Sequence, residues 1–296
     1  MRFSPIFTFL FLTLYGFSAN AAEEIILLAN GVDDEYNRQA LSLALEETID
    51  THGPYRITLS EVMSDSRAAR TLLTKKYTNA VRIGIPGMTL IDLEYATFPV
   101  QLGGLGLQVC FKSKDNPRLN KTINSIDDIK AFTFAAPRNW SDDDIFIENG
   151  FKTEPGFNSS LKRTILHLFQ MASQQKVDYA CRPVTTVAQE LEEFPISQTL
   201  EIEERFALWL EKPLFFGSVD NKALINRIYT GLVSAFQNGK YKAFWEKHYL
   251  QSFQLSNIKE KEIFYLPSSA VSQYKQQYHQ FLYFLPSTNK PPEKSH

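Results

Sequence analysis

The stretch from Gly87 to Val109 reads GMTLIDLEYATFPVQLGGLGLQV, and it separates two patterns of alternating strands and helices. A strand predicted over 79–85 ends at Pro86-Gly87, a pair that interrupts regular structure. Residues 103–106 (GGLG) then begin a run that continues as a strand to Lys112. Because glycine tolerates large backbone rotations, this cluster suits a hinge between two folded units.

The pattern before this stretch predicts a parallel, helix-covered sheet. Residues 25–29 form a compact apolar run typical of a strand, and apolar residues at helical spacing follow as far as His52-Gly53. Strand-like alternation over 55–62, a helix that starts at Ser64 or Asp65, and the strand 79–85 complete a β-α-β-α-β order. Such an order implies parallel strands connected by helices.

The pattern after it predicts a second α/β set. The expected strands are 132–136, 178–181 and 206–216, and the expected helices are 141–149, 158–175, 185–193 and a pair over 223–248 that breaks at Asn238-Gly239. Residues 273–284 are a further candidate helix that packs back on the first set. The fold class is therefore α/β, with mostly parallel sheets flanked by helices.

Composition excludes several classes of protein. The chain has 296 residues, 31 Lys and Arg against 33 Asp and Glu, 44% hydrophobic residues and a mean hydropathy of -0.24. The near-neutral charge gives no basic surface for nucleic acid, and the apolar share is too high for a disordered chain. Two cysteines cannot form a disulfide scaffold or a four-thiolate zinc site.

The N-terminus predicts export. Residues 1–21 combine Arg2, an apolar run over 6–17 and the small-x-small triplet Ala19-Asn20-Ala21, which together are typical of a cleaved signal peptide. The run is shorter than the roughly 20 residues that span a bilayer, which argues against a membrane anchor. The mature chain, with 30 basic and 33 acidic residues, is expected in the periplasm. Residues 286–296 are expected to form a disordered tail.

The order of these elements resembles the type II periplasmic solute-binding proteins, as a divergent, family 3-like member of these two-lobed receptors of ABC uptake systems. The resemblance rests on 87–109, on 158–183 with its Gln175-Lys176-Val177-Asp178 turn, and on the helical pair 223–249. It implies a first lobe from 22–103 and 206–285, and a second lobe from 104–205. The two hinge crossings are then expected near 102–106 and 200–206.

The resemblance also implies a function. A monomer of this kind closes its lobes around a small-molecule ligand and passes it to an ABC permease, with no cofactor. A ligand-sensing partner of a membrane receptor would use the same scaffold and remains the alternative. A periplasmic enzyme is less expected, because the sequence shows no paired acid and base and no activated nucleophile.

The sequence departs from the amino-acid-binding members of that family. Those members have an Arg soon after the Gly-Met-Thr step, whereas residues 89–94 here read TLIDLE. Their acidic residue for the ligand amino group is replaced by Arg182-Pro183. These changes argue against a standard α-amino acid, and we expect a small polar or anionic ligand.

The second lobe supplies one group of candidate ligand contacts. Arg138, Asn139, Trp140 and Ser141 lie between a strand and a helix start, where main-chain N–H groups, an aromatic ring and a guanidinium can meet a ligand. Arg182 follows a predicted strand and is a candidate anion contact. Its alternative is a structural ion pair with a Glu of the next helix, such as Glu190.

The first lobe supplies the other candidates. Ser64, Asp65 and Arg67 open a helix after a strand, and Thr89 is a weaker candidate. We expect no metal site, because residues 142–144 (DDD) point in different directions on a helix and the histidines lack zinc-binding spacing. Cys110 and Cys181 lie in strands that are neighbours in the resembling fold, so they are either a disulfide or two buried thiols.

Overall fold

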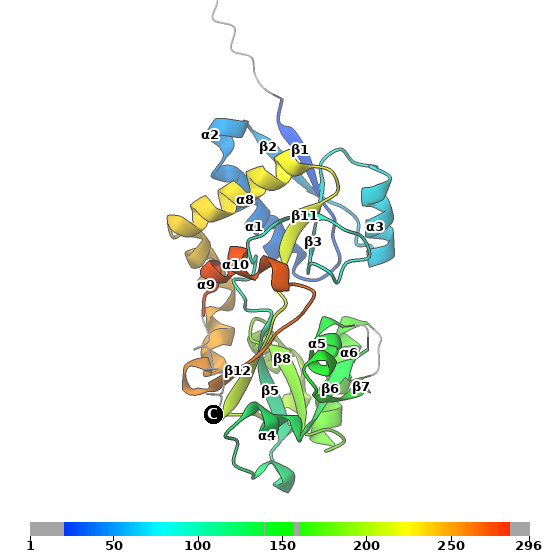
Figure 1. The fold of residues 1–296 in the computed structure, drawn as a ribbon, viewed down its shortest axis with the longest axis vertical. Coiled ribbons are helices and arrows are strands. Elements are labelled where there is room, and N and C mark those ends of the chain that lie inside the picture. Colours follow the sequence, from blue (N-terminus) through cyan, green and yellow to red (C-terminus); the bar gives the residue numbers. More distant parts are fainter. Residues whose placement is uncertain (1–20, 139, 157–159, 285–296) are drawn as a thin grey trace, which may run out of the picture.

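The computed structural model describes residues 21–138, 140–156 and 160–284. Two predictions fall outside these residues: the signal peptide over 1–21, except for residue 21, and the disordered tail over 286–296. Figure 1 shows two lobes, each with a sheet that helices flank. The predicted α/β class with two lobes is therefore confirmed.

The first lobe contains a sheet in the order β2-β1-β3-β11-β4. Its strands are β1 (Glu23–Leu27), β2 (Tyr55–Leu59), β3 (Ala80–Gly84), β4 (Glu94–Ala96) and β11 (Phe215–Ser218). Its helices are α1 (Asp34–Glu46), α2 (Ile49–His52), α3 (Asp65–Leu73) and α8 (Lys222–Gln237). Strand β1 pairs in parallel with β2 and β3, which confirms the predicted β-α-β-α-β order.

The second lobe contains a sheet in the order β12-β10-β5-β8-β6-β7, with β9 also paired to β5. The strands are β5 (Leu107–Ser113), β6 (Thr133–Pro137), β7 (Lys152–Gly156), β8 (Tyr179–Pro183), β9 (Leu200–Ile202), β10 (Phe206–Leu210) and β12 (Glu262–Leu266). The helices are α4 (Ile126–Lys130), α5 (Ser141–Glu148), α6 (Leu161–Ser173) and α7 (Val187–Glu193), with short turns at Pro117–Leu119, Pro195–Thr199 and Ile258–Glu260. The first two residues of the helix predicted over 158–175, residues 158 and 159, lie outside the described residues.

The strand predicted over 206–216 is wrong, because this segment forms two strands in different sheets. Strand β10 pairs with β12 and β5, whereas β11 pairs with β3 and β4. Between them lies Glu211-Lys212-Pro213, where a proline cannot donate to a ladder. The chain therefore returns to the first lobe at 211–214 and not near 200–206, and strands β10 and β12 of the range 206–285 join the second sheet.

The first crossing lies where the glycine cluster predicts it, between β4 and β5. Leu102 and Gly103 have φ angles of 48° and 85°, a left-handed conformation that glycine adopts readily. A Cβ atom at Gly106 would lie 2.2 Å from the carbonyl oxygen of Leu210. The two crossing segments therefore approach too closely for any side chain at that position.

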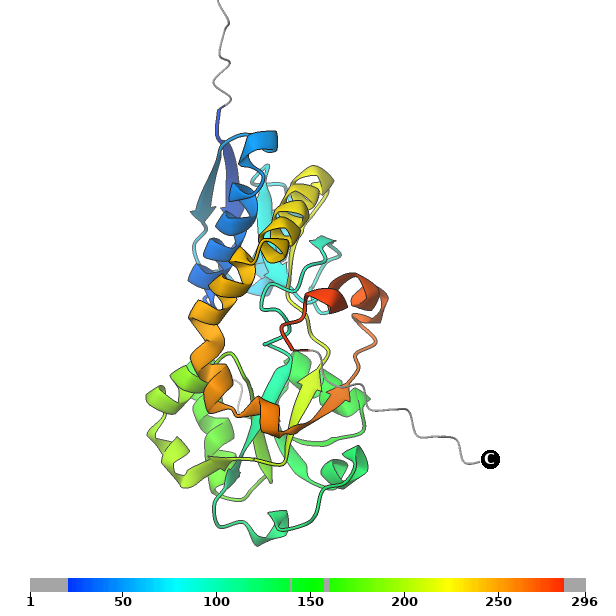
Figure 2. The ribbon, with the colours of Figure 1, turned by 90° about the vertical axis from the view of Figure 1, so that its left-hand side faces the viewer.

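The C-terminal part of the chain crosses the same region twice more. Helix α9 (Lys240–Leu255) runs along the molecule from one lobe to the other (Figure 2). After β12, the chain returns through the turns η4 (Ser272–Tyr274), α10 (Lys275–Tyr278) and η5 (His279–Phe281). The helix predicted over 273–284 is therefore a series of short turns, and it packs on first-lobe residues such as Phe98, 4.9 Å from Phe281 between ring centroids.

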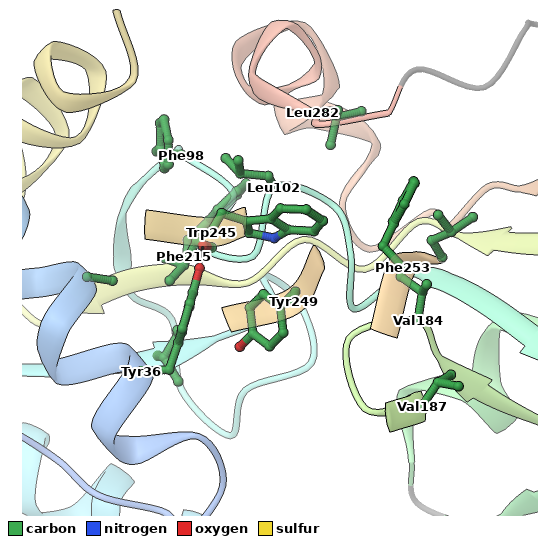
Figure 3. Close-up of a cluster of buried hydrophobic side chains, with 14 of the residues drawn as sticks. Tyr36, Phe98, Leu102, Val184, Val187, Phe215, Trp245, Tyr249, Phe253 and Leu282 are labelled. Atoms are coloured by element: carbon green, nitrogen blue, oxygen red, sulfur yellow. Dashed lines mark hydrogen bonds between the residues drawn. The ribbon is translucent and has the colours of Figure 1, made fainter. Parts of the chain in front are cut away.

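Aromatic side chains fill the space where these segments meet. Trp245 of α9 donates from Nε1 to the carbonyl oxygen of Gln101 at 2.8 Å, and its ring stacks on Tyr283 at 4.1 Å. Figure 3 shows Trp245 and Tyr249 of α9 between Phe98 and Phe253 in this cluster. Burial of such large rings strongly favours the folded arrangement around the hinge.

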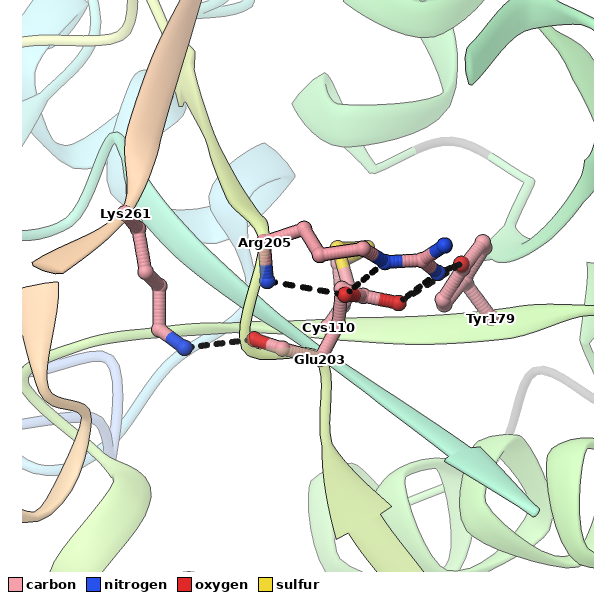
Figure 4. Close-up of a disulfide and its surroundings, with 6 residues drawn as sticks. Cys110, Tyr179, Glu203, Arg205 and Lys261 are labelled. Atoms are coloured by element: carbon pink, nitrogen blue, oxygen red, sulfur yellow. Dashed lines mark hydrogen bonds and ion pairs between the residues drawn. A yellow bond between two sulfur atoms is a disulfide. The ribbon is translucent and has the colours of Figure 1, made fainter. Parts of the chain in front are cut away.

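Cys110 and Cys181 form a disulfide, which settles the alternative that the sequence left open. The two residues are directly opposed in the antiparallel pair of β5 and β8. Beside the disulfide, the buried carboxylate of Glu203 accepts from Arg205 Nε at 2.7 Å and from Tyr179 Oη at 2.9 Å (Figure 4).

This buried carboxylate predicts a loss of stability in acid. Burial alone would raise the pKa of Glu203, but hydrogen bonds from Arg205 and the charge of Lys112 outweigh it and lower the pKa to about 2. The pKa of Glu203 is about 2 in the folded protein and near 4.5 in the unfolded chain. The ionised carboxylate therefore contributes its full stability above pH 4.5, and this contribution is lost as the pH falls toward 2. The contribution at pH 7 is about 3 kcal/mol.

Urea unfolding of the wild type and of Glu203→Gln measures this contribution. We expect the variant to be about 3 kcal/mol less stable at pH 7, with the difference narrowing steadily between pH 4.5 and the acid limit of the folded protein. A difference that does not change with pH would contradict the assignment.

Candidate ligand-binding site

Two adjoining cavities form a cleft between the lobes, each with a volume of about 400 Å³. We call the one bordered mainly by 30–37 and 82–89 the lobe-one cavity, and the one bordered mainly by α6, β8 and α7 the lobe-two cavity. Val32, Asp33, Leu105 and Ser141 line both. Since these shared residues come from both lobes and from the first crossing, the cavities form a continuous cleft.

The fold explains why polar groups gather there. The loop after β1, the start of α3 and the start of α5 all reach the cleft through Asp33, Asp65 and Ser141. Carboxyl ends of strands and N-termini of helices meet at such an edge in open α/β sheets, and this edge is where ligands bind in that architecture.

Asp33 lines both the lobe-one cavity and the lobe-two cavity. Its φ angle of 51° is left-handed, an uncommon conformation for a residue other than glycine. Its Oδ2 accepts from Gln101 Nε2 at 2.9 Å. The carboxylate is open to the cleft, yet the surrounding protein desolvates it and raises its pKa, with the Gln101 hydrogen bond acting in the opposite direction.

Arg82 is the cation of the lobe-one cavity. It belongs to β3 and is 6% exposed, and its Nη2 contacts Asp65 Oδ1 at 2.7 Å. Asp65 is the first residue of α3, where a negative charge also favours the helix N-terminus. The first lobe therefore places an ion pair on the cleft wall.

The lobe-two cavity has two buried ion pairs. Arg182 donates from Nη2 and Nε to the Glu190 carboxylate at 2.6 and 2.9 Å, so the structural pairing left open by the sequence is present. The guanidinium also lies 5.8 Å from the ring centre of Trp140. Lys212 contacts Asp142 at the start of α5, and burial lowers the pKa of its ammonium despite that partner.

The structure brings five of the predicted site residues to the cleft: Asp65, Thr89, Trp140, Ser141 and Arg182. Three others are absent from the described residues that line the two cavities. Ser64 instead caps α3 by accepting from Arg67 N at 3.4 Å, Arg67 pairs with Glu61 on the surface, and Arg138 is exposed. Asn139 lies outside the described residues.

Sequence reasoning missed several residues that line the cleft: Asp33, Asn37, Arg82, Gln101 and Lys212. Arg82 and Lys212 each interrupt an otherwise apolar run, and a charge inside such a run was a signal that they serve a buried site. Asn37 and Gln101 gave no such signal, because only the fold brings them beside Asp33.

Neither a metal centre nor a membrane span is found in the part of the chain that the structure describes. Within it, no three His, Cys, Asp or Glu side chains are grouped so as to hold an ion. None of the helices over 21–138, 140–156 and 160–284 is both long and apolar enough to cross a membrane.

Comparison with known proteins identifies the fold. No protein-family model matches the sequence, and no curated protein matches it. The probable amino-acid ABC transporter extracellular-binding protein ytmK from Bacillus subtilis is structurally similar, with a TM-score of 0.54 and 11% identity over 77% of this chain and 98% of that one. A chain from a study of glutathione import in Streptococcus mutans has a TM-score of 0.50 and 14% identity, over 77% of this chain and 95% of that one. The chain therefore has the same two-lobed α/β fold as these two proteins.

Proposed function

We propose that this protein is an exported solute-binding protein that holds a small polar ligand between its lobes for ABC-type uptake. The observation that carries the proposal is the cleft, whose two cavities of about 400 Å³ are lined by polar side chains from both lobes. A concave site of this size, with a few polar groups at fixed positions, suits a small molecule.

The hinge supports a binding cycle in which the lobes close on the ligand. Two of the segments that cross between the lobes, 97–106 and 211–214, are short, and the first contains Gly103 in a left-handed conformation. Hinges of this kind absorb rotation in a few residues while the lobes move as rigid bodies. The role that we propose is binding, without a catalytic step.

Location and partner follow from the same proposal. The predicted signal peptide would place the mature chain in the periplasm, where an ABC permease would receive the ligand. Uptake is preferred over sensing because the similar Bacillus subtilis protein is described as an extracellular-binding protein of an ABC transporter.

A thermal-shift panel of amines, amino acids, sugars, dicarboxylates and short peptides tests the proposal. A solute present at 100 times its Kd stabilises the folded state by about 2.7 kcal/mol, which raises the Tm by about 5 °C in a chain of this size. We expect at least one such shift. The absence of a shift with every member would contradict the proposal.

A further inference from the structure

The cleft carries an excess of negative charge once its internal ion pairs are counted. Each basic side chain among the described residues that line the two cavities already contacts an acid. The pairs are Arg82 with Asp65, Lys162 with Glu193, Arg182 with Glu190, and Lys212 with Asp142. The cations of the cleft are thus neutralised within the protein, which disfavours an anionic ligand.

Two acids that line the lobe-one cavity, Asp33 and Asp144, are not part of these ion pairs. Neither forms an ion pair within the described part of the chain. The imidazole of His248 is close enough to affect Asp33, but burial lowers the pKa of this imidazole and so weakens it as a cationic partner. Asp33 is therefore an exposed but partly desolvated carboxylate, and among the described residues its side-chain donor is the neutral amide of Gln101.

The helix N-termini that line the lobe-one cavity, those of α1, α3 and α5, do not reverse this balance. A helix N-terminus attracts anions through its free N–H groups and its dipole. Helices α1, α3 and α5 each have acidic residues in the first turn, including Asp34, Asp65 and Asp142. Since the protein's own carboxylates occupy these positions, the positive ends are already compensated.

Two buried hydrogen-bond acceptors beside Asp33 have no donor among the residues that the structure describes. Asn37 and Gln101 line the lobe-one cavity and are 3% and 2% exposed. Their amide nitrogens donate to the Val32 carbonyl and to Asp33, so the side-chain oxygens Oδ1 and Oε1 are the unpaired ends. A buried acceptor without a donor is costly unless a ligand or water supplies one.

We propose that the ligand is a small organic cation whose ammonium or guanidinium group binds at Asp33, with the side-chain oxygens of Asn37 and Gln101 as additional acceptors. This inference rests on the proposed solute-binding function and names the ligand class for that site. A nitrogen cation provides several N–H donors and the charge that Asp33 lacks, so it satisfies all three groups at once.

The same cavity indicates the chemistry of the rest of the ligand. Arg82 Nη1 is buried and has no hydrogen-bond acceptor in the described part of the chain, while the charge of the guanidinium is already balanced by Asp65. An uncharged acceptor such as a hydroxyl or carbonyl oxygen suits a guanidinium in that state. The ligand is therefore a polar cation rather than an apolar amine.

Calorimetric titration with probes of matched shape tests the charge. Agmatine, 1,4-diaminobutane and arginine are the cations; 1,4-butanediol and citrulline are neutral counterparts, and succinate is the anion of similar length. We expect at least one cation to bind about 30-fold or more tightly than its neutral counterpart, since a neutral ligand would enclose the Asp33 carboxylate in the cleft without a charge partner.

Variants locate the cation. Asp33→Asn should lower the affinity for the tightest-binding cation by about 30-fold or more, and asparagine tolerates the left-handed backbone at this position. Asp144 is exposed, so Asp144→Asn should lower the same affinity by only about threefold. Asp50→Asn removes a charge from α2 outside the cleft and should leave affinity unchanged.

Three results would overturn the inference: tighter binding of a neutral or anionic counterpart, full affinity in Asp33→Asn, or no binding by any of these probes. In each case a shift with another member of the wider thermal panel would leave the proposed solute-binding function standing. Failure of the whole panel would remove both.

Discussion

Replacing Cys110 and Cys181 together by alanine lowers the free energy of unfolding by about 4 kcal/mol, the loss expected when a cross-link over a chain separation of 71 residues is removed. Cys110 is in β5, which follows the first crossing, and Cys181 is in β8. The bond therefore ties the central strands of the second sheet, which support Trp140, Arg182 and the lobe-two cavity. Without the disulfide, the unfolded chain gains conformational entropy, and the second lobe is destabilised more than the first.

Guanidinium unfolding of the wild type and the double variant, each with and without a reductant, measures this effect. The reductant should destabilise the wild type to the level of the variant and should not affect the variant. Two thiols that react with an alkylating agent in unreduced, unfolded wild type would contradict the disulfide.

Tyr278→Ala also lowers the free energy of unfolding by about 4 kcal/mol, the usual cost of removing a large buried ring. Tyr278 is 1% exposed, and its ring lies 5.7 Å from that of Phe215 between centroids. Its hydroxyl donates to Glu211 Oε1 at 2.7 Å, at the second crossing between the lobes. The variant therefore leaves both a cavity and a less satisfied buried carboxylate beside the hinge.

Tyr278→Phe is the matched control, because it keeps the ring and removes only the hydroxyl. We expect a loss of about 2 kcal/mol, as for a hydrogen bond to a charged group. Urea unfolding of both variants separates the two contributions. Equal stability of Tyr278→Ala and the wild type would show that the C-terminal turns do not pack on the hinge as described.

Much of the fold could be predicted because local patterns agree with it. The first lobe's strands and helices alternate at regular spacing, and the glycine cluster at 103–106 coincides with the first crossing. The second crossing was misplaced because Phe206 to Phe216 is almost continuously apolar, and a buried strand on either sheet has the same appearance. The proline at 213 and the adjacent charges were the signals for the break.

The candidate site was predictable only in part. Trp140, Ser141 and Arg182 could be placed because they follow strands or begin helices, and cleft residues of α/β folds come from those positions. The partner of Asp33 could not be predicted, since Gln101 is 68 positions away in the sequence. Only the first crossing between the lobes brings Gln101 beside Asp33. The balance of charge in the cleft likewise depends on which acid each cation contacts, and spacing does not determine that.

The most direct test of a ligand site between the lobes is calorimetric titration of the tightest-binding solute into two variants that each gain one aromatic ring. Ser141 lines both cavities, so Ser141→Phe places its ring in the cleft between the lobes. Ser269→Phe places the same ring on an exposed loop outside the two cavities. We expect Ser141→Phe to abolish binding and Ser269→Phe to retain the wild-type Kd. Equal binding by both folded variants would contradict a ligand site between the lobes.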